Sequence, residues 1–308
     1  MQRLEYDRYG GPENVRLSAF TLPAPAVDEV VVRVAAASIN PMDWKIRAGQ
    51  LRLLTGFKFP RAMGADFSGT VEAVGAQVTR FKPGDDVLGS VSMKASGAFA
   101  EKLVANQGNL VKKPENLSFA AAACLPVAGV TAWLALVKKA QLKRGQSLFV
   151  NGALGAVGQA AVAIARGIGA GVAGRVGPRS LAQGQALGLS PALDYTQPLP
   201  ASPGAYDVVF DCNGALSAQE ARRLKKPGGV IVDIVPSGAK IFKALFSRSQ
   251  KIVFADLRAE NLQQVVDLAA AGKLAIPIVR TVALAEAPAL LAALERGERV
   301  NGKAVIAF

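Results

Sequence analysis

The sequence predicts an α/β fold in which a β-rich domain precedes a doubly wound parallel sheet. Two observations along the 308-residue chain lead to this prediction. In residues 1–115, short runs rich in β-branched residues are separated by glycine and proline turns, which is typical of barrel-like β domains. From Ser118 onward, continuous apolar runs alternate with helical segments, which is typical of parallel strands buried on both faces.

The first part of the chain contains four strand candidates. Glu29–Val34 is a run of β-branched residues, and glycines bound the run at residues 68–75. A Pro83–Gly84 turn precedes a further short strand. Residues 98–104 alternate in the manner of a half-buried strand.

The second part begins with an alanine-rich helical segment, residues 118–136, which Ser118 is suited to cap and which Pro126 and Gly129 divide. Strands and helices alternate after it, so a parallel sheet is expected. The expected strands are residues 147–150, 171–176, 206–211 and 229–235, and the expected helices are residues 157–166, 180–188 and 218–224.

The end of the chain changes character again. Residues 261–271 carry apolar side chains at helical spacing, and Gly272 predicts where that helix ends. A second helix is expected over residues 285–296 and a last strand over residues 301–308. We expect this tail to return to the β-rich domain.

The composition excludes several kinds of site. Histidine is absent, which removes imidazole bases, His-paired nucleophiles and most catalytic zinc sites. Cys124 and Cys212 lie far apart, so neither a disulfide framework nor a metal cluster is expected, and the cysteine usage fits a reducing cytosol.

The bulk properties predict a globular cytoplasmic protein. Hydrophobic residues are 51% of the chain and charged residues 19%, which gives ample material for a core. No signal peptide and no membrane span are expected. The net charge of +13 comes from scattered Lys and Arg, which favours a solvated basic surface over a specific nucleic-acid site.

A glycine-rich turn carries the first functional signal. The apolar run Leu148–Val150 is followed by Gly152, Gly155 and Gly158 and then by a helix of small residues. In dinucleotide-binding proteins, such glycines permit the turn, admit the pyrophosphate and let the helix pack on the strand, while the helix N-terminus binds phosphate. A turn in another buried βα unit has similar spacing, so this pattern alone leaves both interpretations open.

Further motifs share their order with a known family. They are NPMDWKIRAG at residues 40–49, GADFSG at 64–69, FKPGDDV at 81–87, PVAGVTAW at 126–133, LKKPGG at 224–229 and Gly302–Lys303. In these motifs, which cover nearly the whole chain, the sequence resembles the zinc-independent medium-chain dehydrogenases/reductases. Within that family it most resembles quinone oxidoreductase-like enzymes of the enone oxidoreductase group.

The resemblance implies three segments with distinct roles. Residues 1–117 would form a GroES-like catalytic domain, residues 118–258 a Rossmann NADPH-binding domain, and residues 259–308 a return to the catalytic domain. It also implies NADPH as the cofactor and a homodimer. Zinc-using relatives carry a Cys at Asn40 and His-Glu at Ala65–Asp66, so no zinc ligand set is expected in this chain.

Candidate cofactor residues follow from the resemblance. After the second strand of the α/β part, NAD enzymes place an acidic residue on the ribose 2′-hydroxyl, whereas this chain has Arg175 and Arg179, which suit a 2′-phosphate. A solvated loop remains the alternative for both arginines. The other candidates are Gly152, Gly155, Ala156, Val157 and Gly158 in the phosphate turn, Thr131 beside the nicotinamide, Tyr195 near the adenosine phosphate, Asn213 and Val235 at strand ends, and Lys303 in the terminal motif.

Asn40 and Lys45 are the candidates for the reacting centre. Lys45 stands where quinone reductases often have a tyrosine, and it could donate a hydrogen bond or a proton to a carbonyl oxygen. A surface lysine, or a lysine on a cofactor phosphate, is the alternative.

The sequence is compatible with two functions. The first is NADPH-dependent reduction of quinones or α,β-unsaturated carbonyls by hydride transfer without zinc. The alternative is a basic NADPH-binding protein that acts mainly in RNA or membrane-surface binding. The net charge of +13 suggests this alternative.

Overall fold

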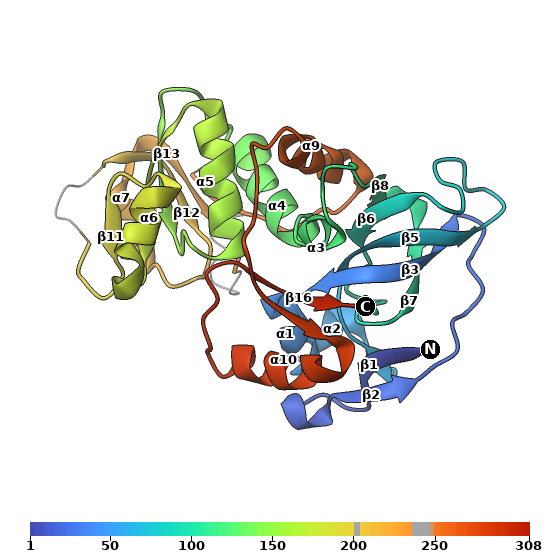
Figure 1. Ribbon diagram of the computed structural model, residues 1–308. Coiled ribbons are helices and arrows are strands. Elements are labelled where there is room, and N and C mark those ends of the chain that lie inside the picture. The colour runs from blue at the N-terminus through green and yellow to red at the C-terminus, as the bar shows by residue number, and fades with distance from the viewer. Residues whose placement is uncertain (200–203, 236–246, 248) are drawn as a thin grey trace. The chain divides into compact units, whose positions relative to one another are not determined.

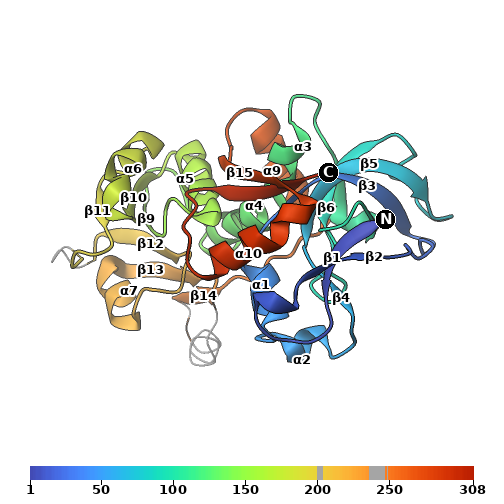
Figure 2. The same ribbon diagram turned by 60° about the horizontal axis from the view of Figure 1, so that its bottom comes forward.

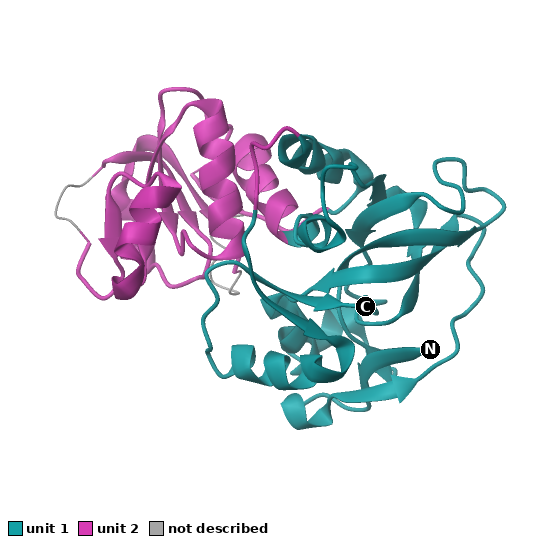
Figure 3. Ribbon diagram, in the orientation of Figure 1, with its two compact units in different colours: residues 1–127, 257–270, 276–308 teal, residues 128–256, 271–275 magenta. Residues whose placement is uncertain are grey.

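The computed structural model describes residues 1–199, 204–235, 247 and 249–308. The chain forms two compact units, shown in teal and magenta in Figure 3. Unit 1 contains residues 1–127, 257–270 and 276–308, and unit 2 contains residues 128–256 and 271–275. The predicted fold class is confirmed, because unit 1 is rich in antiparallel strands and the sheet of unit 2 is parallel.

Unit 1 is built on a seven-stranded sheet with the order β15-β16-β3-β5-β6-β8, in which β7 also pairs with β3. A smaller sheet has the order β2-β1-β4. The strands are β1 (Gln2–Tyr6), β2 (Arg16–Ala19), β3 (Glu29–Ser38), β4 (Arg61–Ala62), β5 (Asp66–Val74), β6 (Asp86–Ser90), β7 (Lys102–Asn106), β8 (Leu110–Lys112), β15 (Ile278–Ala283) and β16 (Lys303–Ala307). Because β16 pairs with β3, the end of the chain completes a sheet that its first part begins (Figure 1).

Several helices belong to unit 1, whose core contains the fully buried side chains of Leu4, Phe67 and Phe99. These helices are α1 (Pro41–Arg47), α2 (Arg52–Thr55), α3 (Phe119–Ala123), α9 (Ala259–Ala270) and α10 (Ala287–Glu295), with short 3₁₀ turns η1 (Pro12–Asn14), η2 (Gln107–Asn109) and η5 (Leu284–Glu286). The start of α1 is fixed by a capping box, in which Asn40 is the N-cap and the Asp43 carboxylate accepts the Asn40 N–H.

One strand of unit 1 differs from the prediction. The alternating run at residues 98–104 is only partly a strand, because β7 begins at Lys102. The preceding Phe99 uses its backbone elsewhere: its N–H donates to the Met63 carbonyl at 2.9 Å and its carbonyl accepts the Leu4 N–H at 2.8 Å. The buried Phe99 ring therefore belongs to a crossing segment that the alternation alone could not distinguish from a strand.

Unit 2 contains a six-stranded parallel sheet with the order β11-β10-β9-β12-β13-β14. Its strands are β9 (Ser147–Asn151), β10 (Gly171–Val176), β11 (Ala192–Asp194), β12 (Tyr206–Asp211), β13 (Lys225–Asp233) and β14 (Gln250–Ile252). Its helical segments are α4 (Pro126–Trp133), which begins at the end of unit 1, η3 (Leu134–Lys139), α5 (Ala156–Ile168), η4 (Pro178–Ser180), α6 (Leu181–Leu187) and α7 (Ala218–Leu224). The strand order reverses between β9 and β12, and ligands bind at such a switch point in open α/β sheets.

Candidate functional site

The glycine-rich turn lies at this switch point of unit 2. Gly152 follows β9 with φ of +83°, a conformation that side chains other than glycine rarely adopt. A Cβ added there would lie 3.3 Å from the Asn213 side-chain nitrogen, so the turns after β9 and β12 meet. The structure therefore brings Gly152 and Asn213 together at the place where a dinucleotide is expected.

Helix α5 starts directly after this turn. Gly155 is its N-cap and provides no side-chain cap, and the first N–H groups of an α-helix have no acceptor within the helix. Ala156 and Val157 open the helix, so alanine at 156 fits the helical backbone. The α5 N-terminus offers donors and a positive dipole end to an anion such as a pyrophosphate.

Gly158 explains how closely α5 packs on the turn. A Cβ at this position would lie 2.8 Å from the Ala153 Cα and closer still to the Gly152 carbonyl oxygen. Both neighbours are backbone atoms that cannot rotate away. Only glycine fits here, which is the packing role that the sequence motif predicts.

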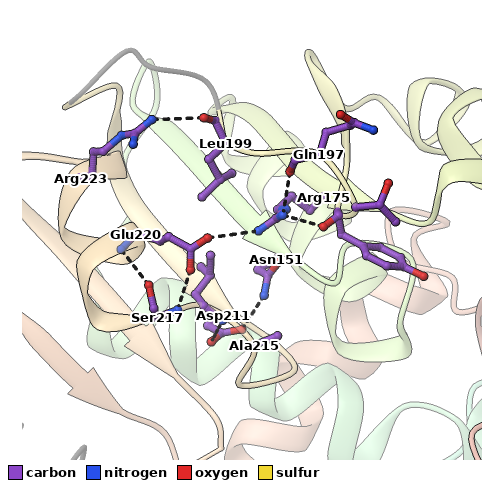
Figure 4. A network of polar contacts seen from close by, with 12 residues as sticks. Asn151, Arg175, Gln197, Leu199, Asp211, Ala215, Ser217, Glu220 and Arg223 are labelled. Carbon is purple, nitrogen blue, oxygen red and sulfur yellow. Dashed lines mark hydrogen bonds and ion pairs between the residues drawn. The ribbon is translucent and has the colours of Figure 1, made fainter.

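A buried amide and carboxylate brace the same edge of the sheet (Figure 4). The Asn151 amide nitrogen donates to Asp211 Oδ1 at 2.9 Å and to Asn213 Oδ1 at 2.7 Å. The Asp211 carboxylate also accepts the backbone N–H groups of Gly214 at 3.0 Å and Leu216 at 3.1 Å. Sequence reasoning missed Asn151 and Asp211, although polar residues that end two apolar strands were a signal for them.

The two candidate arginines lie in different environments. The Arg175 side chain is 11% exposed, donates to the carbonyls of Tyr195 at 2.7 Å and Gln197 at 3.1 Å, and lies 3.9 Å from a Glu220 carboxylate oxygen (Figure 4). Arg179 is exposed and makes no hydrogen bond or ion pair with a described residue. The arrangement leaves Arg179 available to an anion, whereas Arg175 already holds the turn at Tyr195.

The remaining candidates of unit 2 surround the same strand ends with one exception. The Tyr195 ring comes within 3.5 Å of where a Cβ on Gly177 would lie, just before Arg179. Val235 follows β13 and packs against Gly214 beside Asn213. Thr131 is buried within α4 and is not joined to these residues by a hydrogen bond among the described residues.

Unit 1 contains a separate buried polar cluster around Lys303. The Lys303 ammonium donates to the Ser38 hydroxyl at 2.8 Å, the Asn40 side-chain oxygen at 2.7 Å and the Ile39 carbonyl at 3.3 Å. An Asp66 carboxylate oxygen lies 3.6 Å away. Since these three acceptors match the three protons of an ammonium group, the contacts favour an internal role for Lys303 over direct binding of a cofactor phosphate.

Asn40 links this ammonium to a carboxylate. Its amide nitrogen donates to Asp66 Oδ2 at 3.0 Å, and that oxygen also accepts the Val127 N–H at 3.2 Å. Asn40, Asp43 and Asp66 are all buried. Both sides of the Asn40 amide are thus held in one orientation.

The buried carboxyls of the cluster hold protons more tightly than usual. Burial, opposed by the Asn40 N–H and Lys303 and assisted by the Asp66 charge, raises the pKa of Asp43 to about 7. Burial also raises the pKa of Asp66, although Lys303 and the hydrogen bonds from Asn40 and Val127 oppose it. One ammonium therefore lies 3.6 Å from the buried Asp66 and close enough to the buried Asp43 to lower its pKa.

Lys45 lies apart from this network. It is half-buried on α1, and its side chain makes no hydrogen bond or ion pair with a described residue. The structure joins Asn40 to Lys303 and Asp66, and it leaves the Lys45 ammonium available to another group.

The described residues contain neither a metal-binding cluster nor a membrane-spanning helix. In residues 1–199, 204–235, 247 and 249–308, no group of three or more Cys, Asp or Glu side chains could hold a metal ion. Over the same residues, no helix is both long and apolar enough to cross a membrane.

The chain is similar to known oxidoreductases along most of its length. Residues 26–115 match the alcohol dehydrogenase GroES-like domain, and residues 187–306 match the zinc-binding dehydrogenase family. A chloroplast envelope quinone oxidoreductase homolog of Arabidopsis thaliana is 34% identical over 293 residues, which are 89% of this chain and 88% of the relative. An NADPH-dependent alkenal/one oxidoreductase of the same plant is 35% identical over 242 residues, which are 75% of this chain and 62% of the relative.

A solved structure agrees with these matches. The quinone oxidoreductase from Coxiella burnetii superposes with a TM-score of 0.90 and is 29% identical, and the match covers 100% of this chain and 99% of that protein.

Proposed function

The chain belongs to the quinone oxidoreductase-like medium-chain dehydrogenases/reductases, and from this premise we propose that it reduces quinones or α,β-unsaturated carbonyls with NADPH. The observation that carries the proposal is the switch point of unit 2. There, the glycine turn, the uncapped N-terminus of α5 and the exposed Arg179 offer a set of anion-binding groups with no acidic residue in residues 174–180.

These groups fit a dinucleotide with a 2′-phosphate. The N–H groups of Ala156 and Val157 suit the pyrophosphate, and the Arg179 guanidinium suits the 2′-phosphate, which it can bind through two parallel hydrogen bonds. Arg175 holds the Tyr195 turn beside Arg179 through the two carbonyl contacts. Thr131, Tyr195, Asn213 and Val235 complete the proposed cofactor contacts.

The chemistry expected of the protein is mainly orientation and proton control. NADPH supplies the hydride when it is bound. The Lys45 ammonium makes no hydrogen bond or ion pair with a described residue. It is therefore suited to donate a hydrogen bond to the substrate oxygen that gains negative charge. Asn40 is proposed to belong with Lys45 to the reacting centre of unit 1, with its amide held by Lys303 and Asp66.

A substrate panel tests this proposal. We expect NADPH consumption, followed by its absorbance, with quinones and enones and none with simple ketones or alcohols, since the described residues offer no metal ligand set to polarise an unactivated carbonyl. The Lys45→Met variant should lower kcat/KM for enones more than it changes KM for NADPH. Absence of NADPH consumption with every quinone and enone would contradict the proposal.

A cytoplasmic homodimer completes the proposal. Both cysteines of the sequence are free thiols in the structure, as is common in a reducing compartment. Sedimentation equilibrium of the purified chain would give the oligomeric state, and a monomer at all concentrations would contradict the homodimer.

A further inference from the structure

Two loops of unit 1 expose large apolar side chains. On and after α2, Leu53 is 86% exposed, Leu54 68% and Phe57 63%, and Met93 in the loop after β6 is 43% exposed. We call these four residues the apolar tip. Exposed apolar residues that are grouped in this way commonly mark an interaction site.

The apolar tip stands on a well-anchored base. The buried Thr55 hydroxyl donates to the Leu51 carbonyl at 3.1 Å, and the Tyr9 hydroxyl donates to the Gly56 carbonyl. Arg61 joins the two loops, because its guanidinium donates to the Thr55 carbonyl at 2.7 Å and to the Lys94 carbonyl at 3.1 Å. Figure 2 shows α2 at the edge of the unit, beyond α1 and close to β4.

The charged side chains in the loops of the apolar tip are all cationic. Arg52, Lys58 and Lys94 are exposed beside it. Neither residues 44–65 nor residues 87–100 contain an Asp or Glu, in a chain with a net charge of +13. We call Arg52, Lys58 and Lys94 the basic margin of the apolar tip. A surface that combines projecting apolar groups with such a margin is suited to bind anionic membrane interfaces.

We propose that the apolar tip docks on an anionic lipid bilayer. Leu53, Leu54 and Phe57 would enter the boundary between headgroups and acyl chains, while the neighbouring cations contact lipid phosphates. Side chains with most of their surface in solvent project from the protein instead of lining a groove, which suits insertion into a fluid layer better than a shaped protein partner. The charge of the margin selects anionic lipids over neutral ones.

Vesicle co-sedimentation of the full chain tests the proposal. We expect binding to vesicles of phosphatidylcholine with phosphatidylglycerol, weaker binding to phosphatidylcholine alone, and release by salt. L53S/L54S should weaken binding by about tenfold or more, from the loss of buried apolar area. The control is Phe254→Ser, a single apolar-to-serine change at a 66% exposed position of unit 2, which should bind as the unmodified chain does.

The charge contribution has its own control. R52Q/K58Q should weaken binding by about fivefold for each cation, whereas K138Q/K139Q removes the same charge from exposed positions of unit 2 and should have a much smaller effect. In F57W, tryptophan fluorescence should be quenched by lipids with brominated acyl chains, over the background of Trp44 and Trp133 in the unmodified chain.

Three results would overturn the proposal. They are absence of binding to the anionic vesicles, equal binding to neutral ones, and unchanged binding of L53S/L54S while that variant keeps its native circular dichroism spectrum. Loss of a dimer in L53S/L54S, in a chain that does not bind vesicles, would assign the apolar tip to a second copy of the chain instead.

Discussion

The Lys303 ammonium allows two carboxyl groups to be buried inside unit 1. It lies 3.6 Å from Asp66 and donates to Asn40, which in turn donates to Asp66. Removing one partner of a buried ion pair leaves an uncompensated charge, which costs far more than the loss of an exposed pair.

Lys303→Met should therefore destabilise the protein by about 3–5 kcal/mol in urea unfolding. The added change Asp66→Asn should restore part of this loss, because the unpaired carboxylate is gone. Arg280→Met is the matched control: its pair with Glu298 is 49% and 46% exposed, so a loss of less than about 1 kcal/mol is expected. Equal stability losses in Lys303→Met and Arg280→Met would contradict this account of the cluster.

The raised pKa of Asp43 predicts that the free energy of unfolding depends on pH. Its pKa is raised from 3.8 to about 7 in the folded protein, so the folded state keeps a proton that the unfolded chain loses. The contribution of Asp43 to stability therefore falls as pH rises from about 4 to about 7, by at most about 1.4 kcal/mol per pH unit, and stays constant at higher pH. Asp43→Asn should remove this slope from the difference between variant and parent unfolding free energies, and an unchanged slope would show that Asp43 is ionised throughout.

At the scale of elements, α5 packs closely on the turn before it. Gly158 packs on backbone atoms of the turn, whereas Gly167, near the other end of the same helix, has open space where its Cβ would lie. The same substitution at these two positions separates packing on the turn from helix propensity.

Gly158→Ala should weaken NADPH binding, measured by calorimetry, and lower the melting temperature, because the turn must move to admit a methyl group. Gly167→Ala should raise stability by up to about 1 kcal/mol and leave NADPH binding unchanged, since alanine is the better helix former. If Gly158→Ala bound NADPH as tightly as Gly167→Ala does, the close packing would have no functional role.

The elements also show what the sequence could predict. The strands over residues 147–150, 171–176 and 206–211 were found within one residue, because apolar runs bounded by polar ends mark buried parallel strands. The partners of Arg175 and Lys303 could not be predicted, since both motifs look like exposed anion-binding groups until the fold brings the Tyr195 and Asn40 oxygens to them. Burial and long-range contacts are not properties of a local pattern.

At the scale of the whole molecule, the cationic side chains serve different roles on the surface and in the interior. The basic excess leaves Arg179 and the margin of the apolar tip free for anions, while Lys303 is used internally. The RNA-binding alternative has no support in the two relatives described above, which are named as a quinone oxidoreductase homolog and an alkenal/one oxidoreductase. Under the proposed function, docking on a bilayer would give the enzyme access to quinones dissolved there.

The most direct measurement compares NADPH with NADH as the reductant of one quinone. We predict a higher kcat/KM with NADPH, and in Arg179→Ala a loss of about 10- to 100-fold that falls on KM for NADPH and leaves NADH kinetics unchanged, as expected when a charged hydrogen bond to a phosphate is lost. Equal use of both cofactors by the unmodified protein, or an unchanged preference in Arg179→Ala, would contradict the claim that the switch point of unit 2 selects NADPH.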